Sequence, residues 1–484
     1  MDIPASAQVQ QAWVARYNNG LTNGTNQAVK MALDSAGNIY VTGFSQNASG
    51  NLGYVTIKYA PSGSQVWATR YDSSSYKSAT PSGLILDNSN NVIVTGSAIT
   101  IKYDLNGDQV WAAPYNAASI AADGSNNVYI TGVSQNFETI KLSPTGSNLW
   151  TAVDTGNYSG PQNVAQLLAV DLVGNTVVAG DEILNSNSTG VTVAVAVVKY
   201  NSEGGIIWRD TADTDGFPYV AGAYVDVSAL VLDMQTNPYV VLGSSSPSGT
   251  AYSTFKIASS GNLIWTASPA SGNVHNTAYG IALSSANNVL LVGQEFHMGD
   301  SASGTISLTT NGSTAWSALY PAAYTGTGGG MSIAVDLANN SYVTGYSPGA
   351  NSSNDIVTIA YGPNGNQLWL QRYHGPGGGD DAGNAIAVDN NGNVYVTGYE
   401  ATTAGGTEIV TIKYSPLILQ KQANGSFLLQ AQGSPGEGFD IQASADLINW
   451  QDLGSVLADT NGLMQFADTN AASHPARFYI TNPQ

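Results

Sequence analysis

The segment 209–226, "RDTADTDGFPYVAGAYVD", carries the densest set of side chains in the chain that could bind a ligand. It combines three carboxylates with three aromatic rings, namely Asp210, Asp213, Asp215, Phe217, Tyr219 and Tyr224. Carboxylates beside exposed rings suit sugars, because sugar hydroxyls form hydrogen bonds while sugar C–H faces stack on rings. We therefore predict a glycan-binding surface here. The alternative is a polar loop that packs on its neighbour through its aromatic residues.

Two sets of residues have the chemistry of metal ligands. Asp213 and Asp215 stand on alternate residues before a glycine, which is half of a calcium-binding loop. Calcium is thus the one ion this pattern would admit, and we expect no other cofactor. The second set is His275, Glu295, His297 and Asp300, which could hold a zinc-like ion if these residues converge. The alternative is that these histidines, like His374, are solvated loop residues.

The composition excludes several classes of function. The net charge of −19 argues against binding to nucleic acid or to an anionic membrane surface. The longest apolar run, "VTVAVAVV" at 191–198, has the length of a strand and cannot span a bilayer. With no cysteine, disulfides and thiolate metal sites are excluded. Ala5-Ser6-Ala7 resembles the end of a secretory signal, so we expect residues 1–10 to be a leader remnant and the protein to be secreted or at the cell surface.

The elements that must position these residues are built from a repeat. The phrase "DSAGNIYVTG" at 34–43 returns as "DNNGNVYVTG" at 389–398, and eight copies can be aligned. Each copy follows an apolar stretch that closes in Asp (Ser in the sixth), with Asn four residues later. We interpret this as a hairpin turn in which Asp bonds to backbone N–H groups and Asn takes a left-handed conformation. Eight calcium ligands are the alternative, and the recurrence at every turn favours the hairpin.

A second hairpin follows each phrase. "TIKYAPSGSQVW" at 56–67 recurs in degraded forms, and seven times a glycine precedes the tryptophan by four residues. Glycine supplies the positive φ that such a turn requires. Each unit therefore has four short strands, and units of this size predict the blades of a β-propeller. The lysines of "TIKY" and the arginines Arg16, Arg70 and Arg372 are expected to form structural contacts between blades or on the rim.

The two ends of the repeat region complete each other. The eighth copy stops after "TIKY" at 411–414, whereas the chain begins with a tryptophan strand, "WVARY" at 13–17, that has no unit before it. Pairing these fragments removes the exposed sheet edges of an open stack. The sequence thus predicts an all-β fold: an eight-bladed β-propeller of four-stranded blades over 11–415, with the ring closed by the N-terminal strand.

At this point the sequence resembles the bacterial β-propeller repeat family abbreviated SBBP. Its pattern "D-x-x-G-N-V-Y-V-T-G … T-I-K-Y-x-x-x-G-x-x-x-W" is matched best at 384–414 and 34–71, and the resemblance extends over about 10–415. It implies a secreted or cell-surface location and brings no catalytic residues.

Residues 416–484 alternate between apolar and polar residues with the period of half-buried strands. Their "S-x-D-L-x-x-W … R-F-Y" pattern resembles a small fibronectin-like β-sandwich that ends many secreted bacterial proteins.

The two hairpins of every unit should lie on one uniform face of the disc, and the connections of variable length on the other. Variable loops on a rigid frame commonly form binding surfaces, so we predict that 180–190 and 209–226 form a raised wall there. We expect a non-catalytic binding, adhesion or extracellular assembly protein whose partner is a glycan, a cell-surface component or another copy of itself. The alternative is a quinoprotein-like dehydrogenase or another propeller enzyme with its site on the variable-loop face.

Overall fold

The fold was analysed in a computed structural model of the 484-residue chain. The structure describes residues 9–132, 137–156, 164–187, 190–211, 220–221, 225–244, 253–268, 276–297, 300–320, 327–349, 353–433, 436–445, 449–460, 462–474 and 477–483. In these ranges the fold is all-β, as predicted, with one 3-10 turn at Ala471–Ser473 (η1). No helix in the described part of the chain has the length and apolar character needed to cross a membrane.

The repeat region forms antiparallel sheets, which we number from the N-terminus by their first strand. Sheets 1 to 4 consist of β2 (Asn26–Leu33), β3 (Ile39–Gln46), β4 (Leu52–Tyr59) and β5 (Gln65–Tyr71); β6 (Pro81–Leu86), β7 (Val92–Gly96), β8 (Thr100–Tyr103) and β9 (Gln109–Ala113); β10 (Ser119–Ala122), β11 (Val128–Thr131), β12 (Phe137–Leu142) and β13 (Asn148–Asp154); and β14 (Val164–Val170), β15 (Thr176–Asn187), β16 (Gly190–Tyr200) and β17 (Ile206–Thr211), with β18 (Val220–Ala221) beside β16. Sheets 5 to 8 consist of β19 (Val225–Leu232), β20 (Pro238–Ser244), β21 (Ser253–Ile257) and β22 (Leu263–Ala267); β23 (Asn276–Leu283), β24 (Val289–His297), β25 (Asp300–Leu308) and β26 (Thr314–Tyr320); β27 (Gly329–Val335), β28 (Ser341–Pro348), β29 (Asn354–Tyr361) and β30 (Gln367–Tyr373); and β31 (Ala382–Val388), β32 (Val394–Ala401), β33 (Thr407–Pro416) and β1 (Val9–Tyr17).

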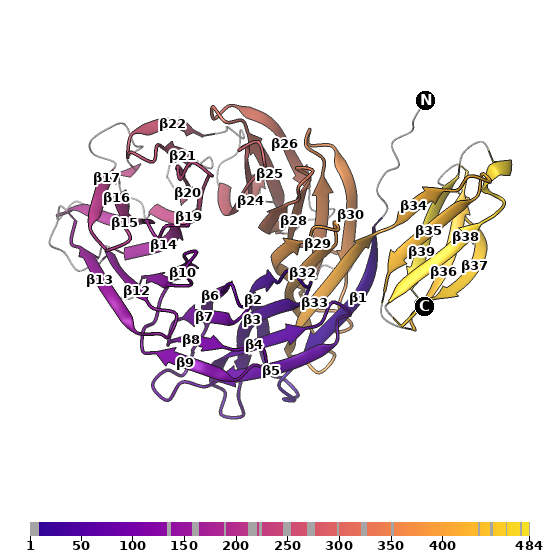
Figure 1. The fold of residues 1–484 in the computed structure, drawn as a ribbon, viewed down its shortest axis with the longest axis horizontal. Helices are drawn as coiled ribbons and strands as arrows, with labels where there is room; N and C mark the ends of the chain where they lie inside the picture. The colour runs from indigo at the N-terminus through magenta and orange to yellow at the C-terminus, as the bar shows by residue number, and fades with distance from the viewer. Residues whose placement is uncertain are drawn as a thin grey trace.

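The sheets stand side by side in a closed ring (Figure 1). The first strand of each sheet is innermost and contacts the first strands of both neighbouring sheets, including β2 against β31. The predicted pairing of the chain's two ends is confirmed, because β1 runs antiparallel to β33 with Val14 opposite Ile412. Apolar side chains between adjacent sheets form the core, as in the cluster of Val41, Ile57 and Ile409.

The turn after the inner strand is held by an aspartate in seven of the sheets, as the sequence predicts, and by Ser284 in sheet 6. In sheet 8, the Asp389 carboxylate accepts bonds from the backbone N–H groups of Asn391 and Asn393, at 2.8 and 2.9 Å. It also accepts from the Asn393 amide (2.7 Å) and the Tyr395 hydroxyl (3.1 Å). One detail of the prediction was wrong. The left-handed residue comes one position before the repeated Asn, for example Gly392 (φ 77°), and the Asn instead donates to the aspartate through its side chain.

Two features of the second hairpin require a glycine, namely its backbone conformation and the close approach of a tryptophan ring. Gly107 has a φ of 85°, which an L side chain rarely adopts. A Cβ on it would also lie 2.8 Å from the indole ring of Trp67, which belongs to the preceding sheet. The Trp67 indole nitrogen donates to the carbonyl of Leu105 in the same turn (2.9 Å). Seven repeat tryptophans donate in this way, and each of them joins its own sheet to the hairpin of the next one.

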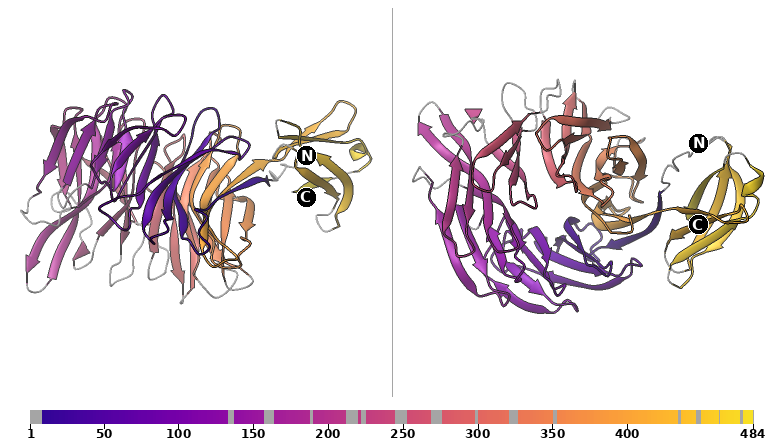
Figure 2. Two further views of the ribbon diagram at one scale, coloured as in Figure 1. Left: turned by 90° about the horizontal axis from the view of Figure 1, so that it is seen from below. Right: turned by 45° about the horizontal axis from the view of Figure 1, so that its top comes forward.

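Residues 416–484 form a separate unit beside the ring (Figure 2). One three-stranded sheet contains β34 (Ile418–Lys421), β35 (Phe427–Gln432) and β38 (Leu463–Asp468), and the other contains β37 (Gln451–Leu457), β36 (Gly438–Ser444) and β39 (Phe478–Pro483). The two sheets share a core that includes Leu429, Phe439 and Met464. The unit contacts the ring where β35 meets β1 and β33 and where β39 meets β1.

The segment 180–190 differs from the predicted loop. It continues the strands β15 and β16, and residues as far as Asn187 and Gly190 still pair. Residues Gly180 to Ile183 continue to pair with the valine-rich part of β16. Valine has a high propensity for β-strands, which favours this extension. This part of the predicted wall is therefore a long hairpin in sheet 4.

Candidate functional site

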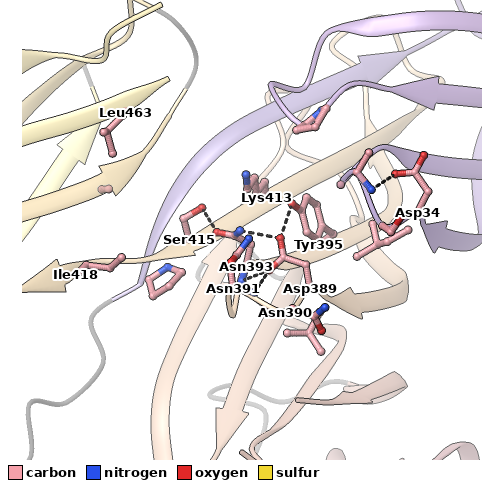
Figure 3. A pocket seen from close by; sticks show the side chains of 18 of the residues that line it. Asp34, Asp389, Asn390, Asn391, Asn393, Tyr395, Lys413, Ser415, Ile418 and Leu463 are labelled. Carbon is pink, nitrogen blue, oxygen red and sulfur yellow. Dashed lines mark hydrogen bonds between the residues drawn. The ribbon is translucent and has the colours of Figure 1, made fainter. Parts of the chain in front are cut away.

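A pocket of about 650 Å³ lies where sheets 1 and 8 meet the C-terminal unit (Figure 3). It is lined by the turns 34–37 and 389–393, by Pro61 of the second hairpin of sheet 1, and by Lys413, Ser415, Ile418, Gln430 and Leu463. Ten of the nineteen lining residues carry an amide, a hydroxyl or a charged group, and the others are apolar residues and one glycine. Such a lining suits a polar ligand better than an apolar one.

Each of the two carboxylates of the pocket accepts four hydrogen bonds from its own turn and the strand that follows it. Asp389 accepts four hydrogen bonds, as described above. Asp34 accepts from the backbone N–H groups of Ala36 and Asn38, from the Asn38 amide, and from the Tyr40 hydroxyl. These acids therefore hold the pocket wall in place. The exposed amides of Asn390 and Asn391 are better placed to meet a ligand.

The predicted sugar-binding residues fall mostly outside the described ranges. Asp213, Asp215, Phe217, Tyr219 and Tyr224 lie there, so the wall at 209–226 stays a prediction. Asp210 is described. It lies in β17 opposite Val197 of β16 and is buried, with 7% of its surface exposed, so it belongs to the sheet.

The predicted zinc-like set is only partly described. His275 lies outside the described ranges, and of His297 the structure describes the backbone alone. His297 pairs with Asp300 in the register of β24 and β25, two residues along from Glu295. Asp300 is exposed, whereas Glu295 is 5% exposed. The register thus brings three of the four positions close together along one hairpin, and the metal itself stays a prediction.

His374 takes part in a different cluster, with Asp355 and Asp381 between sheets 7 and 8. Within the described part of the chain, this trio has the spacing of a metal site. However, Asp355 already pairs with the Arg372 guanidinium (2.7 Å) and with His374 Nδ1 (2.8 Å). Asp381 accepts from the backbone N–H groups of Gly375 and Ala401, at 2.6 and 2.8 Å. Because arginine supplies the positive charge, we interpret this cluster as part of the frame.

The structural role predicted for the rim arginines is confirmed. Arg16 pairs with the fully buried Glu400 and lies 3.6 Å from Glu408, and it donates to the Tyr373 hydroxyl of sheet 7 (2.5 Å). Arg209 forms the same kind of contact in sheet 4, with Glu182 (2.8 Å) and with Asp154 of sheet 3 (2.6 Å). In both cases an arginine of an outer strand neutralises a buried glutamate and ties two sheets together.

Sheet 6 has the glutamate of this network but not the arginine. Glu295 stands two residues after Gly293, as Glu400 does after Gly398. Leu319, which pairs with Gly304, takes the place that Arg16 has opposite Val410. No described residue forms a salt bridge with Glu295, and burial raises the pKa of its carboxyl group. Leu319 itself is 55% exposed, so an apolar side chain faces solvent beside a buried acid.

Replacing Leu319 with arginine should therefore stabilise the protein, by about 1 kcal/mol at neutral pH. Ionised Glu295 opposes folding while its pKa is raised, and a guanidinium would lower that pKa. The gain should be full above the raised wild-type pKa of Glu295. It should be lost as the pH falls from there through the lower pKa that Glu295 has in the variant, because the carboxyl group is then neutral in both proteins. Urea unfolding across that range measures it. Leu319→Gln is the uncharged control, and an equal gain from it would contradict the charge argument.

One family model and several solved structures are similar to parts of this chain. Residues 372–399 match the family described as a β-propeller repeat (SBBP). A protein of unknown function from Dyadobacter fermentans is 9% identical with a TM-score of 0.41, covering 86% of this chain and 100% of that one. A protein of unknown function from Bacteroides caccae is 12% identical with a TM-score of 0.34, covering 57% and 91%. The Drosophila plexin A complex with semaphorin 1b is 10% identical with a TM-score of 0.40, covering 84% and 88%. No curated protein matches the chain.

Sequence reasoning missed the pocket because it lies beside the hairpin turns, on the face expected to be uniform. Its walls come from residues far apart in the chain, such as Asp34, Asn391 and Gln430. The pairing of β1 with β33 predicts that the turns of sheets 1 and 8 are neighbours. The contact with the C-terminal unit has no comparable signal in the sequence.

Proposed function

We propose that the chain is a non-catalytic, secreted or cell-surface binding protein. In this proposal sheets 1 to 8 are the blades of one eight-bladed propeller, and residues 416–484 are a fibronectin-like β-sandwich that completes its binding site. The observation that carries the proposal is the polar pocket at this junction. The carboxylates of Asp34 and Asp389 form hydrogen bonds within their own turns, whereas Asn390 and Asn391 are exposed. A rigid rim with exposed amides suits recognition of a hydroxylated ligand such as a glycan.

The experiment is glycan-array binding of the full chain, compared with a variant whose pocket is blocked. Asn391→Trp places a large ring at the mouth of the pocket. Ser125→Trp is the matched control, because Ser125 holds the same turn position in sheet 3 and does not line the pocket. We expect glycan binding by the wild type and the control and its loss in Asn391→Trp. If no glycan binds, or if both variants bind alike, the pocket is not the recognition site.

Self-association is a second candidate function, favoured by one feature of the rim. The residue before the repeat tryptophan lies at a β-bulge in the outer strand, and five such residues are apolar and about half exposed: Val66, Val110, Leu149, Ile207 and Ile264. Exposed apolar side chains on unpaired edge strands favour contact with another protein surface. Mass measurement in solution with Val110→Asp and Leu149→Asp tests this. A monomeric wild type would contradict it.

A further inference from the structure

The lysines of the repeat make the same contact from sheet to sheet. In sheets 1 to 4 the lysine Nζ donates to a carbonyl in the second hairpin of the next sheet, at 3.0–3.5 Å. That carbonyl is also the acceptor of the tryptophan indole N–H, for example Pro144 for both Lys102 and Trp111. In sheet 5, Lys256 pairs with Asp233 at 3.5 Å. Lys102 and Lys141 also pair with the turn aspartates of their own sheets, so each of these five lysines has a carbonyl acceptor, a carboxylate partner or both.

Lys413 of sheet 8 departs from this rule. The equivalent carbonyl, that of Pro61 in sheet 1, accepts from Trp13 at 3.1 Å but takes no hydrogen bond from Lys413. Among the described residues Lys413 has neither a hydrogen bond nor a salt bridge. Its Nζ lies 5.5 Å from the centre of the Tyr395 ring, and only 5% of the residue is exposed. Burial lowers the pKa of its amine, and the nearby Asp389 opposes that shift.

This unpaired lysine lines the pocket between the ring and the C-terminal unit. Figure 3 shows it between Tyr395 and the pair formed by Asn393 and Ser415. The turn aspartate pairs with the repeat lysine in sheets 2, 3 and 5, whereas Asp389 forms no salt bridge with Lys413. A buried ammonium without an acceptor is costly, and an anionic group in the pocket would supply that acceptor.

We propose that this pocket binds an acidic saccharide, with Lys413 pairing to the carboxylate of a uronic acid unit. The other side chains that face the pocket, including Asn390, Asn391, Ser35 and Gln430, offer amide and hydroxyl groups that match sugar hydroxyls. A lysine on a flexible stem can meet a carboxylate without the fixed two-point geometry that an arginine needs. The inference rests on the proposed function and adds a ligand class to it.

The test is calorimetric titration of the full chain with trigalacturonate, its fully methylated ester and a triglutamate peptide. We expect binding of trigalacturonate that weakens as salt is added, and no comparable binding of the ester. Lys413→Met should weaken trigalacturonate binding about tenfold or more, since it removes the charge and keeps the bulk. Lys256→Met is the matched control, because Lys256 is the same repeat residue in sheet 5 and does not line the pocket. It should bind like the wild type.

Three results would overturn the proposal. Equal binding of the ester would show that the carboxylate is not recognised. Equal binding of triglutamate would show that the sugar is not recognised. Wild-type affinity in Lys413→Met would place the ligand elsewhere. Binding of neutral glycans that Asn391→Trp abolishes and Lys413→Met leaves intact would reject this inference and keep the proposed function, so the two failures can be told apart. A second readout, the stability of Lys413→Met, checks that the variant is folded.

Discussion

Replacing Arg16 with methionine should lower the free energy of unfolding by about 3 kcal/mol, because the change leaves a buried carboxylate without its cation. Glu400 is fully buried, and besides Arg16 its carboxylate accepts from the Tyr373 hydroxyl at 2.5 Å. Burial already raises the pKa of Glu400, against the opposing effects of Tyr373 and Arg16. Without Arg16 that pKa rises further, so the deficit should be full at neutral pH and should shrink as acid protonates the carboxyl group.

Urea unfolding of Arg16→Met and of Arg70→Met measures this effect against a matched control. Arg70 occupies the same position in the outer strand of sheet 1, but its carboxylate partner is Asp72, whose side chain is 46% exposed. Water can solvate Asp72 when the arginine is removed, so Arg70→Met should cost less than about 1 kcal/mol. Equal losses in the two variants would show that burial of the acid does not determine the cost.

Deleting residues 1–17 should destabilise the protein far more than deleting residues 1–8. The longer deletion removes β1, which leaves the edge of β33 unpaired and uncovers the surface beneath Trp13. Trp13 is 5% exposed and lies against Gly63 of sheet 1. Loss of a buried tryptophan side chain alone costs about 3–5 kcal/mol. We therefore expect a loss of about 5 kcal/mol or more, or aggregation during purification.

The measurement is thermal unfolding of both truncated proteins beside the full chain. The shorter deletion stops just before β1 begins at Val9 and should keep the melting temperature of the full chain. The variant Trp13→Ala separates the side chain from the strand, because it keeps the pairing of β1 with β33. Equal melting temperatures for the two truncations would show that β1 does not close the ring.

The sequence predicted the frame well because the frame depends on local chemistry repeated many times. A turn aspartate such as Asp389 and a hairpin glycine such as Gly107 act within a few residues of the chain, so their spacing is visible in the sequence. The role of Trp67 in the next sheet was less visible, since the contact joins two repeats. The closing pair could be predicted only because each end of the chain supplies the part of a unit that the other lacks.

The candidate site was harder to predict because it depends on hydrogen bonds that other copies of the repeat form and that this copy lacks. Lys413 and Lys102 have nearly the same sequence neighbours, yet only Lys102 reaches the carbonyl of the next sheet. The carbonyl belongs to another sheet in both cases, so the local sequence around the lysine does not show whether the bond forms. The absence of an arginine beside Glu295 was visible in the sequence as Leu319, but its meaning required knowing which strand position faces the glutamate.

Sheet 8 takes its strands from both ends of the repeat region, and this has a consequence for how such a chain can evolve. The closing strands β1 and β33 come from opposite ends of the repeat region, whereas the other sheets each arise from one uninterrupted stretch. A gene duplication of one such stretch would insert a whole sheet between the two ends and leave both closing strands unaltered. Ring size can therefore change by copying or losing a single unit, while the same seam of paired residues, Val14 with Ile412 among them, is inherited unchanged.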